Sequence, residues 1–506
     1  MNIILVALNA KFIHSSLAVH SLYAHLDKCT HHGELQKHVT IKEFTINHRE
    51  ELIVSELFGL KPDVLAFSCY VWNIEMILSI VKVFRKIMPD VKIVLGGPEV
   101  SYWNADGLDA DSLRADSLRA DSRDTDLDAD FIICGEGEEA FRSLVQSLVY
   151  GVTNHGPLTK NPSDAPLDYT ATLLPLDHIP FVYQHGFHNF ENRIIYYETS
   201  RGCINRCGFC LTSATHGVRF LPLDRAFDDL SIFLSNNVRQ VKFVDRTFNC
   251  NKQHAMAIWE YLIRNDNNTT NFHFEISGDM LDDEMIDMIG QARSGLFQFE
   301  IGVQSTNPKT LSAISRDTDT AKLLNNVRKL RKLDNVHLHL DLIVGLPYED
   351  RTSFIKSFND VMACSPHQLQ VGFLKLLRGS ALRRDADKYG MKFHDKAPYE
   401  ILANDFIGYV EINRIKKIEH MVEKFYNSGG FDAYIEHMMP KFKTAYDFYE
   451  ALSVYWEDNE YHMRAHKWYA LYTILYEFGG KSEGVRHSLS ADILRKENVR
   501  NFPEWV

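Results

Sequence analysis

The stretch ETSRGCINRCGFCLTS occupies residues 198–213. Its cysteines, Cys203, Cys207 and Cys210, have the spacing CxxxCxxC and follow directly on the apolar run RIIYYETS. A loop at the carboxyl end of a strand lets three thiolates converge, as in the active sites of barrel enzymes. Three cysteines leave one iron of a 4Fe–4S cube without a protein ligand, whereas ferredoxin-type clusters use four. The spacing therefore predicts a cluster with one open iron for a small molecule.

The alternative reading of this stretch is a structural zinc site. Zinc would take a fourth ligand, and His216 is near enough in sequence to give a site of three Cys and one His. Against zinc, Gly202 and Gly208 loosen the loop, and Phe209 supplies an aromatic neighbour. The context favours the iron–sulfur cluster.

Strand-like and helical stretches alternate from this motif onward. Repetition of strand, helix, strand requires parallel pairing with right-handed crossovers. Six such units in under 200 residues predict an incomplete (β/α)6 TIM-type barrel with one open side. The six runs are RIIYYETS, QVKFVDRTF, NFHFEISG, LFQFEIGVQS, VHLHLDLIVG and HQLQVGFLKLL, starting at Arg193, Gln240, Asn271, Leu296, Val336 and His367.

A separate series of short apolar runs precedes the motif. Continuous apolar runs rich in Val and Ile suit strands buried on both faces of a parallel sheet. We therefore expect an N-terminal doubly wound, Rossmann-like α/β domain, with Asn73 as the N-cap of a helix. Its expected strands cover residues 2–8, 39–46, 64–72, 91–97 and 130–135.

The remaining chain divides by composition. An acidic insertion at residues 106–130 contains a five-residue repeat with nine Asp and three Arg, and it cannot bury a core. Beyond about residue 386 the sequence becomes helical and aromatic, with Tyr449, Leu452 and Tyr455 spaced on one helix face. We expect an α/β domain at 1–150, a linker at 151–190, a partial barrel at 191–385 and a C-terminal helical domain at 386–506.

Composition limits the class of protein. The formal net charge of -12 argues against nucleic acid as a partner, because it repels phosphate backbones. No apolar run reaches the ~20 residues that cross a bilayer, and the start lacks a cleavable signal. The sequence thus predicts a cytoplasmic protein without membrane attachment. Of the eight cysteines, the five outside the motif are expected to be small buried hydrophobes without chemistry.

The motif and the strands after it resemble the radical SAM superfamily. FHFEISGD, FEIGVQSTNP with ISR downstream, and LDLIVGLP are similar to barrel strands of the anaerobic coproporphyrinogen oxidase branch. The resemblance implies reductive cleavage of S-adenosylmethionine to a 5'-deoxyadenosyl radical, with a flavodoxin- or ferredoxin-type electron donor. The S-adenosylmethionine pocket that it implies consists of Phe209, Asp245, Thr247, Glu275, Gln304, Arg316 and Asp341.

The N-terminal domain resembles the cobalamin-binding domain that precedes many radical SAM domains. The resemblance is carried by GGPEV at Gly96 and GEGEEAF at Gly135, and it implies cobalamin as a cofactor. The D-x-H-x-x-G signature of a lower axial histidine is absent, and His14 is expected to serve a helix start instead. A vestigial domain that binds nothing is the alternative. The implied cobalamin residues are Ser68, Tyr70, Gly96, Gly97, Pro98, Glu99, Gly135, Glu136 and Gly137.

Three functions follow from these patterns. The first is a cobalamin-dependent methyltransferase acting on an unactivated carbon. The second is a cobalamin-associated radical oxidoreductase or cyclase without methyl transfer. The third is a non-catalytic cobalamin or cluster sensor, which an intact S-adenosylmethionine pocket disfavours. The substrate, a small molecule or a peptide, is not readable. Arg378, Arg383 and Arg384 after the sixth strand are expected to be solvated surface residues rather than an anion site.

Overall fold

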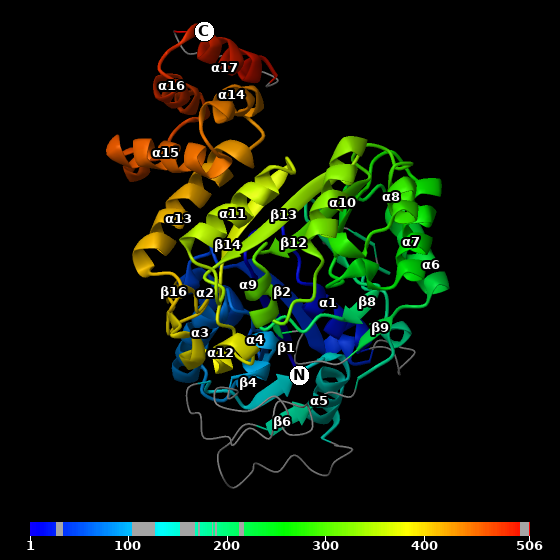
Figure 1. Ribbon diagram of the computed structural model, residues 1–506. Helices are drawn as coiled ribbons and strands as arrows, with labels where there is room; N and C mark the ends of the chain where they lie inside the picture. The colour runs from blue at the N-terminus through cyan, green and yellow to red at the C-terminus, as the bar shows by residue number, and fades with distance from the viewer. Residues whose placement is uncertain are drawn as a thin grey trace. The chain divides into compact units, whose positions relative to one another are not determined.

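Figure 1 shows the helices and strands of the computed structural model, coloured along the chain. The chain divides into two compact units. The first comprises residues 1–275, 375–388 and 393–400, and the second comprises 276–374, 389–392 and 401–506. Most of the acidic insertion, much of the expected linker and His216 lie outside the residues that the structure describes. Those residues are 1–26, 34–103, 127–151, 167–170 (backbone only), 173–184, 186–187, 190–211, 217–495 and 505.

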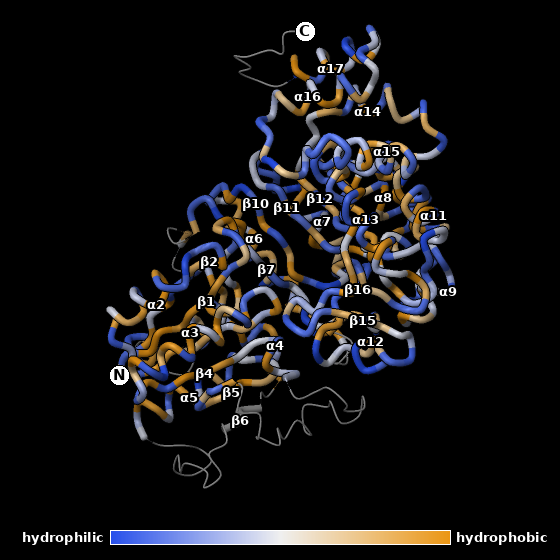
Figure 2. The backbone as a smooth tube through the Cα atoms, turned by 90° about the vertical axis from the view of Figure 1, so that its left-hand side faces the viewer, coloured by the Kyte–Doolittle hydropathy of each residue, from blue (hydrophilic) through white to orange (hydrophobic). Residues whose placement is uncertain are grey.

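The first unit begins with a parallel six-stranded sheet in the order β2-β1-β3-β4-β5-β6. The five strands expected from apolar runs are all present, and β6 is an addition from the segment expected to be a linker. Figure 2 shows β1 and β4 as strongly hydrophobic. The strands are β1 (Ile3–Asn9), β2 (Val39–Thr45), β3 (Val64–Ser68), β4 (Lys92–Gly96), β5 (Phe131–Cys134) and β6 (Leu167–Thr170).

Helices bury both faces of this sheet. Alternate residues of β1 enter different cores: Val6 packs in one with Phe84, and Leu5 packs in the other with Phe141. The domain is therefore doubly wound, as expected. Asn73 occupies the N-cap position of α3, as expected, but its side chain makes no cap bond. Its Oδ1 accepts from the nitrogen of Tyr70, and its Nδ2 donates to the carbonyls of Leu8 and Ser68. The helices are α1 (Leu17–His25), α2 (Glu50–Gly59), α3 (Ile74–Ile87), α4 (Pro98–Ser101) and α5 (Glu138–Tyr150).

The six strands expected for the barrel are present. In the first unit β7 (Ile195–Tyr197), β10 (Gln240–Phe243) and β11 (Asn271–Ile276) pair in parallel in that order. In the second unit β12 (Phe297–Gln304), β13 (His337–Val344) and β14 (Gln368–Phe373) do the same. The helices of this series are α6 (Leu223–Ser235), α7 (Lys252–Arg264), α8 (Asp283–Ile289), α9 (Pro308–Ala313), α10 (Thr320–Leu333), α11 (Arg351–Met362) and α12 (Ala381–Arg384).

The C-terminal region is helical, as expected. Tyr449 and Leu452 are fully buried, and the ring of Tyr449 lies 6.2 Å from that of Phe358 on α11. In the described parts of the chain no helix is long and apolar enough to cross a membrane. The region contains α13 (Tyr409–Met421), α14 (Asp432–Met438), α15 (Ala445–Asp458), α16 (Trp468–Phe478) and α17 (Glu483–Arg495).

Candidate active site

The three-cysteine loop begins at a short hairpin. Strand β8 (Ser200–Gly202) pairs antiparallel with β9 (Val218–Phe220). Gly202 has φ of 111°, and a Cβ there would lie 2.2 Å from the carbonyl oxygen of Gly217. Only glycine accepts both the positive φ and this close approach of backbone. Gly202 therefore sets the direction in which the chain enters the loop at Cys203.

Polar groups surround the first cysteine. Cys203 Sγ lies 3.4 Å from the backbone nitrogen of Asn205 and 3.4 Å from Oγ1 of Thr247. Within the described ranges no three His, Cys, Asp or Glu side chains are grouped to hold one metal ion. In a 4Fe–4S cube each cysteine binds its own iron, so the three sulfurs need not converge on one centre. The N–H of Asn205 fits a sulfur that carries negative charge, whereas the Thr247 hydroxyl donates to the carbonyl of Arg246 at 2.8 Å.

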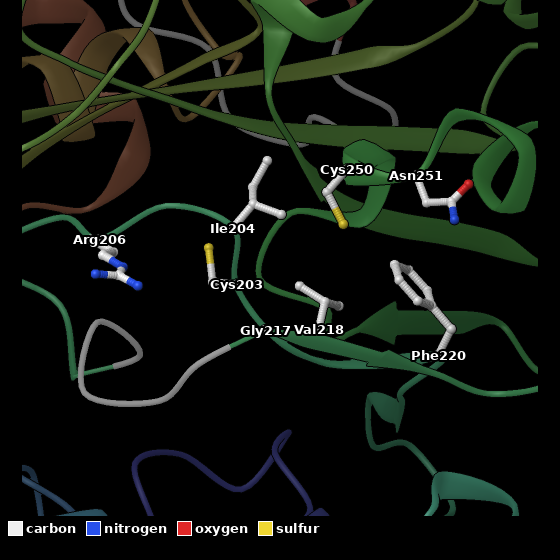
Figure 3. Close-up of a pocket in the computed structure, with 8 residues that line it drawn as sticks. All are labelled: Cys203, Ile204, Arg206, Gly217, Val218, Phe220, Cys250 and Asn251. Atoms are coloured by element: carbon white, nitrogen blue, oxygen red, sulfur yellow. The ribbon is translucent and has the colours of Figure 1, made fainter. Parts of the chain in front are cut away.

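A cavity of about 570 Å³ opens beside Cys203 (Figure 3). Arg206, Phe220, Cys250 and Asn251 are among its other lining residues. Burial, and next the neighbouring Cys203, raise the pKa of the Cys250 thiol to about 11. The sequence indicated no chemistry for Cys250. In the structure it lines the same cavity as Cys203, a predicted cluster ligand. Sequence spacing gave no signal for it.

Asp245, predicted to meet S-adenosylmethionine, is 1% exposed and faces β8. Its carboxylate accepts bonds from the nitrogen of Thr199 (3.0 Å), the hydroxyl of Thr199 (2.8 Å) and the hydroxyl of Ser200 (2.6 Å). Burial raises its pKa to about 6 in spite of these bonds. In this arrangement Asp245 supports the strand before Cys203, and Thr247 is the neighbour that contacts the cysteine itself.

Arg201, between Asp245's partners and Cys203, is the centre of an ion-pair network. Its guanidinium donates to Glu136 (2.9 Å), Glu138 (2.9 Å) and Glu198 (3.1 Å from Nε). Arg219 on β9 also donates to Glu136. Burial opposes ionisation of Glu138, but the charge and bonds of Arg201 outweigh it and lower the pKa of Glu138. The hairpin is thereby fixed to the loop that follows β5.

In the second unit, three predicted S-adenosylmethionine residues gather around Gly302. Asp341 on β13 pairs with Gly302 in the strand register, and Nη2 of Arg316 donates to the Gly302 carbonyl at 2.6 Å. A Cβ at Gly302 would lie 2.2 Å from Nε2 of Gln304 and 3.7 Å from Nη2 of Arg316. The bare backbone of Gly302 therefore leaves room for the amide and the guanidinium. These groups and the Asp341 carboxylate suit an amino acid moiety.

Two further predicted residues lie in the first unit. Glu275 stands near the end of β11 and Phe209 stands in the three-cysteine loop, and both are half-buried. Glu275 is therefore at the carboxyl end of its strand, as the sequence indicated.

Predicted cobalamin residues lie in loops after β3 and β4. The nitrogen of Cys69, between Ser68 and Tyr70, donates to the Gly96 carbonyl at 2.7 Å. Gly97 has φ of 109°, and a Cβ there would lie 2.6 Å from the oxygen of Cys69. Pro98 begins α4 directly after this contact. The two loops therefore lie side by side through their backbones at the carboxyl ends of the strands, where ligands of open α/β sheets bind.

The third predicted cobalamin loop joins the same edge. The nitrogen of Gly135, which has φ of 75°, donates to the Ser101 hydroxyl at 3.0 Å. Gly137 packs closely, since a Cβ there would lie 3.1 Å from Leu22. Glu136 pairs with Arg201 and Arg219, so its carboxylate is engaged within the first unit.

Glu99, another of the predicted cobalamin residues, has a side chain that is 3% exposed. It accepts a 2.5 Å bond from the hydroxyl of Tyr399, and Nε of Arg378 lies 3.6 Å away. Arg378 also stacks over Trp103 at 4.1 Å, and Arg383 stacks over Tyr399 at 4.6 Å. The expectation of solvated surface arginines is therefore wrong for Arg378 and Arg383, which pack on aromatic rings.

His14 is engaged with β7 and does not cap a helix. Its Nδ1 lies 2.6 Å from the hydroxyl of Tyr196, and α1 begins later, at Leu17. Burial lowers its pKa, aided by Lys11 and Lys242. This side chain holds the first loop to the strand that leads to the three-cysteine motif.

Comparison with known families identifies the domains. Residues 3–145 match the B12 binding domain, and residues 197–361 match the Radical SAM superfamily. The chain therefore carries a radical SAM domain preceded by a B12 binding domain. A radical SAM domain implies a 4Fe–4S cluster and S-adenosylmethionine, and the B12 binding domain supports cobalamin. Residues 387–506 match a family described as a protein of unknown function (DUF4080).

Two curated relatives are named as methyltransferases. The cobalamin-dependent radical SAM methyltransferase TokK of Streptomyces tokunonensis is 27% identical over 381 residues, which cover 67% of this chain and 51% of TokK. The 2-(S-pantetheinyl)-carbapenam-3-carboxylate methyltransferase of Streptantibioticus cattleyicolor is 27% identical over 342 residues, covering 61% and 46%. The chain thus spans about half the length of the curated relatives it matches.

Solved structures share the fold. The cobalamin-dependent S-adenosylmethionine radical enzyme OxsB superposes with a TM-score of 0.60 at 14% identity, covering 98% of this chain and 79% of OxsB. The radical S-adenosylmethionine methyltransferase TsrM from Kitasatospora setae gives 0.57 at 14% identity, covering 79% and 80%. The predicted fold class, an N-terminal Rossmann-like domain, an incomplete barrel and a helical C-terminal region, is confirmed.

Proposed function

We propose that this chain is a cobalamin-dependent radical SAM methyltransferase that acts on an unactivated carbon. The radical SAM part of this proposal rests on the CxxxCxxC loop, which Gly202 and Asp245 support at β8. It also rests on the polar residues around Gly302, which are Gln304, Arg316 and Asp341. Cys203, Cys207 and Cys210 would hold the 4Fe–4S cluster, which when reduced would supply the electron for cleavage of S-adenosylmethionine to methionine and a 5'-deoxyadenosyl radical. Methyl transfer is favoured over the oxidoreductase or cyclase because the curated relatives are named methyltransferases.

In this proposal the residues divide the work by their chemistry. Cys203, Cys207 and Cys210 ligate three irons, and Arg316 pairs with the methionyl carboxylate. Glu275 or Asp341 accepts hydrogen bonds from the ribose hydroxyls. The remaining predicted contacts to S-adenosylmethionine are Phe209 at the adenine and Thr247 and Gln304 in the pocket.

The cobalamin site is proposed at the edge formed by the loops after β3, β4 and β5. Ser68, Tyr70, Gly96, Gly97 and Pro98 are retained from the predicted set, and Gly135 and Gly137 join them. Glu99 and Glu136 are less suited to contact the corrin, since Tyr399 and Arg201 already bond to their carboxylates. We also propose the limits 1–150, 151–190, 191–385 and 386–506 for the domains, a flavodoxin- or ferredoxin-type donor, and a cytoplasmic location.

Anaerobic reconstitution tests the radical SAM part of the proposal. The wild-type chain should bind about four irons and form 5'-deoxyadenosine from S-adenosylmethionine with dithionite as reductant. Cys207→Ala should lose both, whereas the matched variant Cys364→Ala, at a buried cysteine in the turn after α11, should keep both. Cleavage by Cys207→Ala would overturn the cluster assignment.

Product analysis separates the two enzyme hypotheses. A methyltransferase forms S-adenosylhomocysteine in addition to 5'-deoxyadenosine, whereas an oxidoreductase or cyclase forms only the latter. Chains produced with cobalamin supplied should show corrin absorption in the visible range. Absence of that absorption at saturating cobalamin would support a vestigial N-terminal domain.

A further inference from the structure

Gln304, at the end of β12, has an unusual backbone conformation. Its φ is 66°, a left-handed value that side chains other than glycine rarely adopt. The nitrogen of Ser305 donates to the carbonyl of Val303 at 2.9 Å, so a tight three-residue turn closes around Gln304. The ladder with β13 shifts register at the same point. Such strain persists only where surrounding groups hold the turn in place.

Two buried hydroxyls hold the segment that follows the turn. The nitrogen of Asn307 donates to the hydroxyl of Ser305 at 3.0 Å, and the nitrogen of Thr306 donates to the hydroxyl of Ser357 at 3.0 Å. Ser305 is 0% exposed and Ser357 is 1% exposed. Each hydroxyl uses its oxygen to accept from the backbone, so its proton must be donated elsewhere.

Both protons go to one acceptor. Ser305 donates to Oε1 of Glu349 at 2.6 Å, and Ser357 donates to the same oxygen at 3.0 Å. Glu349 is 1% exposed, and its Oε2 has no hydrogen-bond partner among the residues that the structure describes. Burying a carboxyl that makes only two hydrogen bonds costs folding free energy. A residue with this cost is a candidate for a specific role. Its position orients both hydroxyls toward the backbone after Gln304.

We propose that Glu349 is a positioning residue which, through Ser305 and Ser357, fixes the turn that places the Gln304 amide over Gly302. The inference rests on the proposed function, because Gln304 matters only if S-adenosylmethionine binds there. Glu349 itself touches no reacting atom. Without it, the hydroxyls rotate, the turn relaxes to an unstrained φ, and the amide leaves its place beside Arg316.

The test uses the full chain, reconstituted anaerobically, with dithionite as reductant. Glu349→Ala should keep its iron content and the electron paramagnetic resonance spectrum of its reduced cluster, yet raise the KM for S-adenosylmethionine about tenfold or more. The change that S-adenosylmethionine causes in that spectrum should need correspondingly higher concentrations. Glu349→Gln should restore KM to near the wild-type value, since its amide oxygen can accept from both hydroxyls.

A control separates positioning from general destabilisation. Asp492→Asn alters another buried acid, which accepts from the nitrogens of Ala433 and Tyr434 in the helical region. This variant should lose stability and keep the wild-type KM. If Glu349→Ala does not fold, Ser305→Ala decides instead, with the same expected rise in KM.

Distinct outcomes identify which idea fails. An unchanged KM in folded Glu349→Ala, or in Ser305→Ala as its substitute, overturns the positioning role while the proposed function stands. A raised KM that Glu349→Gln does not rescue also overturns the role, because the hydroxyl acceptor is then not what matters. A wild-type chain that holds its cluster but leaves S-adenosylmethionine intact overturns the proposed function, and this inference with it.

Discussion

Nη1 of Arg201 donates to Oε2 of Glu136 over 2.9 Å, joining residues that are 65 positions apart in the sequence. Glu136 follows β5 of the N-terminal sheet, and Arg201 lies two residues before Cys203. Arg219, on the strand paired with β8, reaches the same carboxylate. The hairpin that leads into the predicted cluster loop is therefore held by the domain that matches the B12 binding family.

Replacing Arg201 should destabilise the first unit. Arg201→Ala leaves the partly buried carboxylates of Glu136, Glu138 and Glu198 without their shared cation. Breaking a buried network in this way costs about 3 kcal/mol or more. Urea unfolding should show the loss, and reconstituted chains should lose iron faster in air.

An exposed ion pair provides the control for Arg201. Arg264 pairs with Glu260 on α7, and their side chains are 73% and 47% exposed. Arg264→Ala should cost less than about 1 kcal/mol. Equal losses from the two variants would contradict a structural role for the Arg201 network.

Gly202→Ala should prevent stable cluster loading. The added methyl group would lie 2.2 Å from the Gly217 oxygen at a residue with φ of 111°, so the hairpin must distort just before Cys203. Iron content after reconstitution should fall well below the wild-type value. Gly59→Ala is the matched control, because nothing lies within 4 Å of a Cβ there and alanine favours helix. Full iron loading of Gly202→Ala would show that the hairpin geometry is dispensable.

Tyr399→Phe tests the buried position of Glu99. The change removes the hydroxyl that donates to Glu99 and leaves two cations near the carboxylate, Arg378 at 3.6 Å and Arg383. Burial already raises the pKa of Glu99, so the loss of a donor should cost about 1 to 3 kcal/mol in unfolding free energy. Tyr476→Phe, which removes an exposed bond to the Lys481 carbonyl, should cost less. Equal unfolding midpoints for the two variants would argue against the Glu99 contact.

The stability of the second unit should depend on pH through Glu349. Burial raises the pKa of Glu349 to about 7, with a further contribution from the charge of Asp350. At pH values between the unfolded pKa of about 4.3 and the folded pKa of about 7, Glu349 is protonated in the folded chain and ionised in the unfolded chain. The stabilising contribution of the group is therefore complete at low pH and is lost as pH rises toward 7.

Glu349→Gln should not show this loss, because its amide does not titrate. The stability of the variant relative to wild type should increase between pH 5 and pH 8 by an amount on the order of 2 kcal/mol. Urea unfolding at the two pH values measures the difference. A difference that stays constant with pH would mean that the carboxyl keeps one protonation state in both folded and unfolded chains.

Much of the fold was readable because burial leaves a trace in composition. The strands β1, β3 and β4 are continuous apolar runs, since both of their faces are covered by helices. In contrast, β6 is only four residues long and lies in a segment with little periodicity. Asn73 takes the predicted N-cap position, but the nitrogen of Tyr70 donates to the side-chain oxygen that a cap bond would use.

The candidate site was only partly readable. The spacing of Cys203, Cys207 and Cys210 is local, so the sequence displays it directly. That Asp341 stands beside Gly302 depends on strand register, which residue spacing alone does not fix. The roles of Arg201 and Glu349 depend on partners distant in sequence, Glu136 and Ser305. For Glu349, the sequence shows only a carboxyl a few residues after an apolar strand, which does not indicate a role.

The contact between Gly97 and Cys69 has a consequence for how this edge of the sheet can vary among homologues. The loops after β3 and β4 meet through main-chain atoms. Gly97 is the residue that cannot be replaced in this contact, because a Cβ would lie 2.6 Å from the oxygen of Cys69. Neighbouring side chains can then be exchanged without moving the edge, because peptide groups are common to every sequence. Such an edge can outlast most of the residues around it, which accords with a shared fold at 14% identity to OxsB.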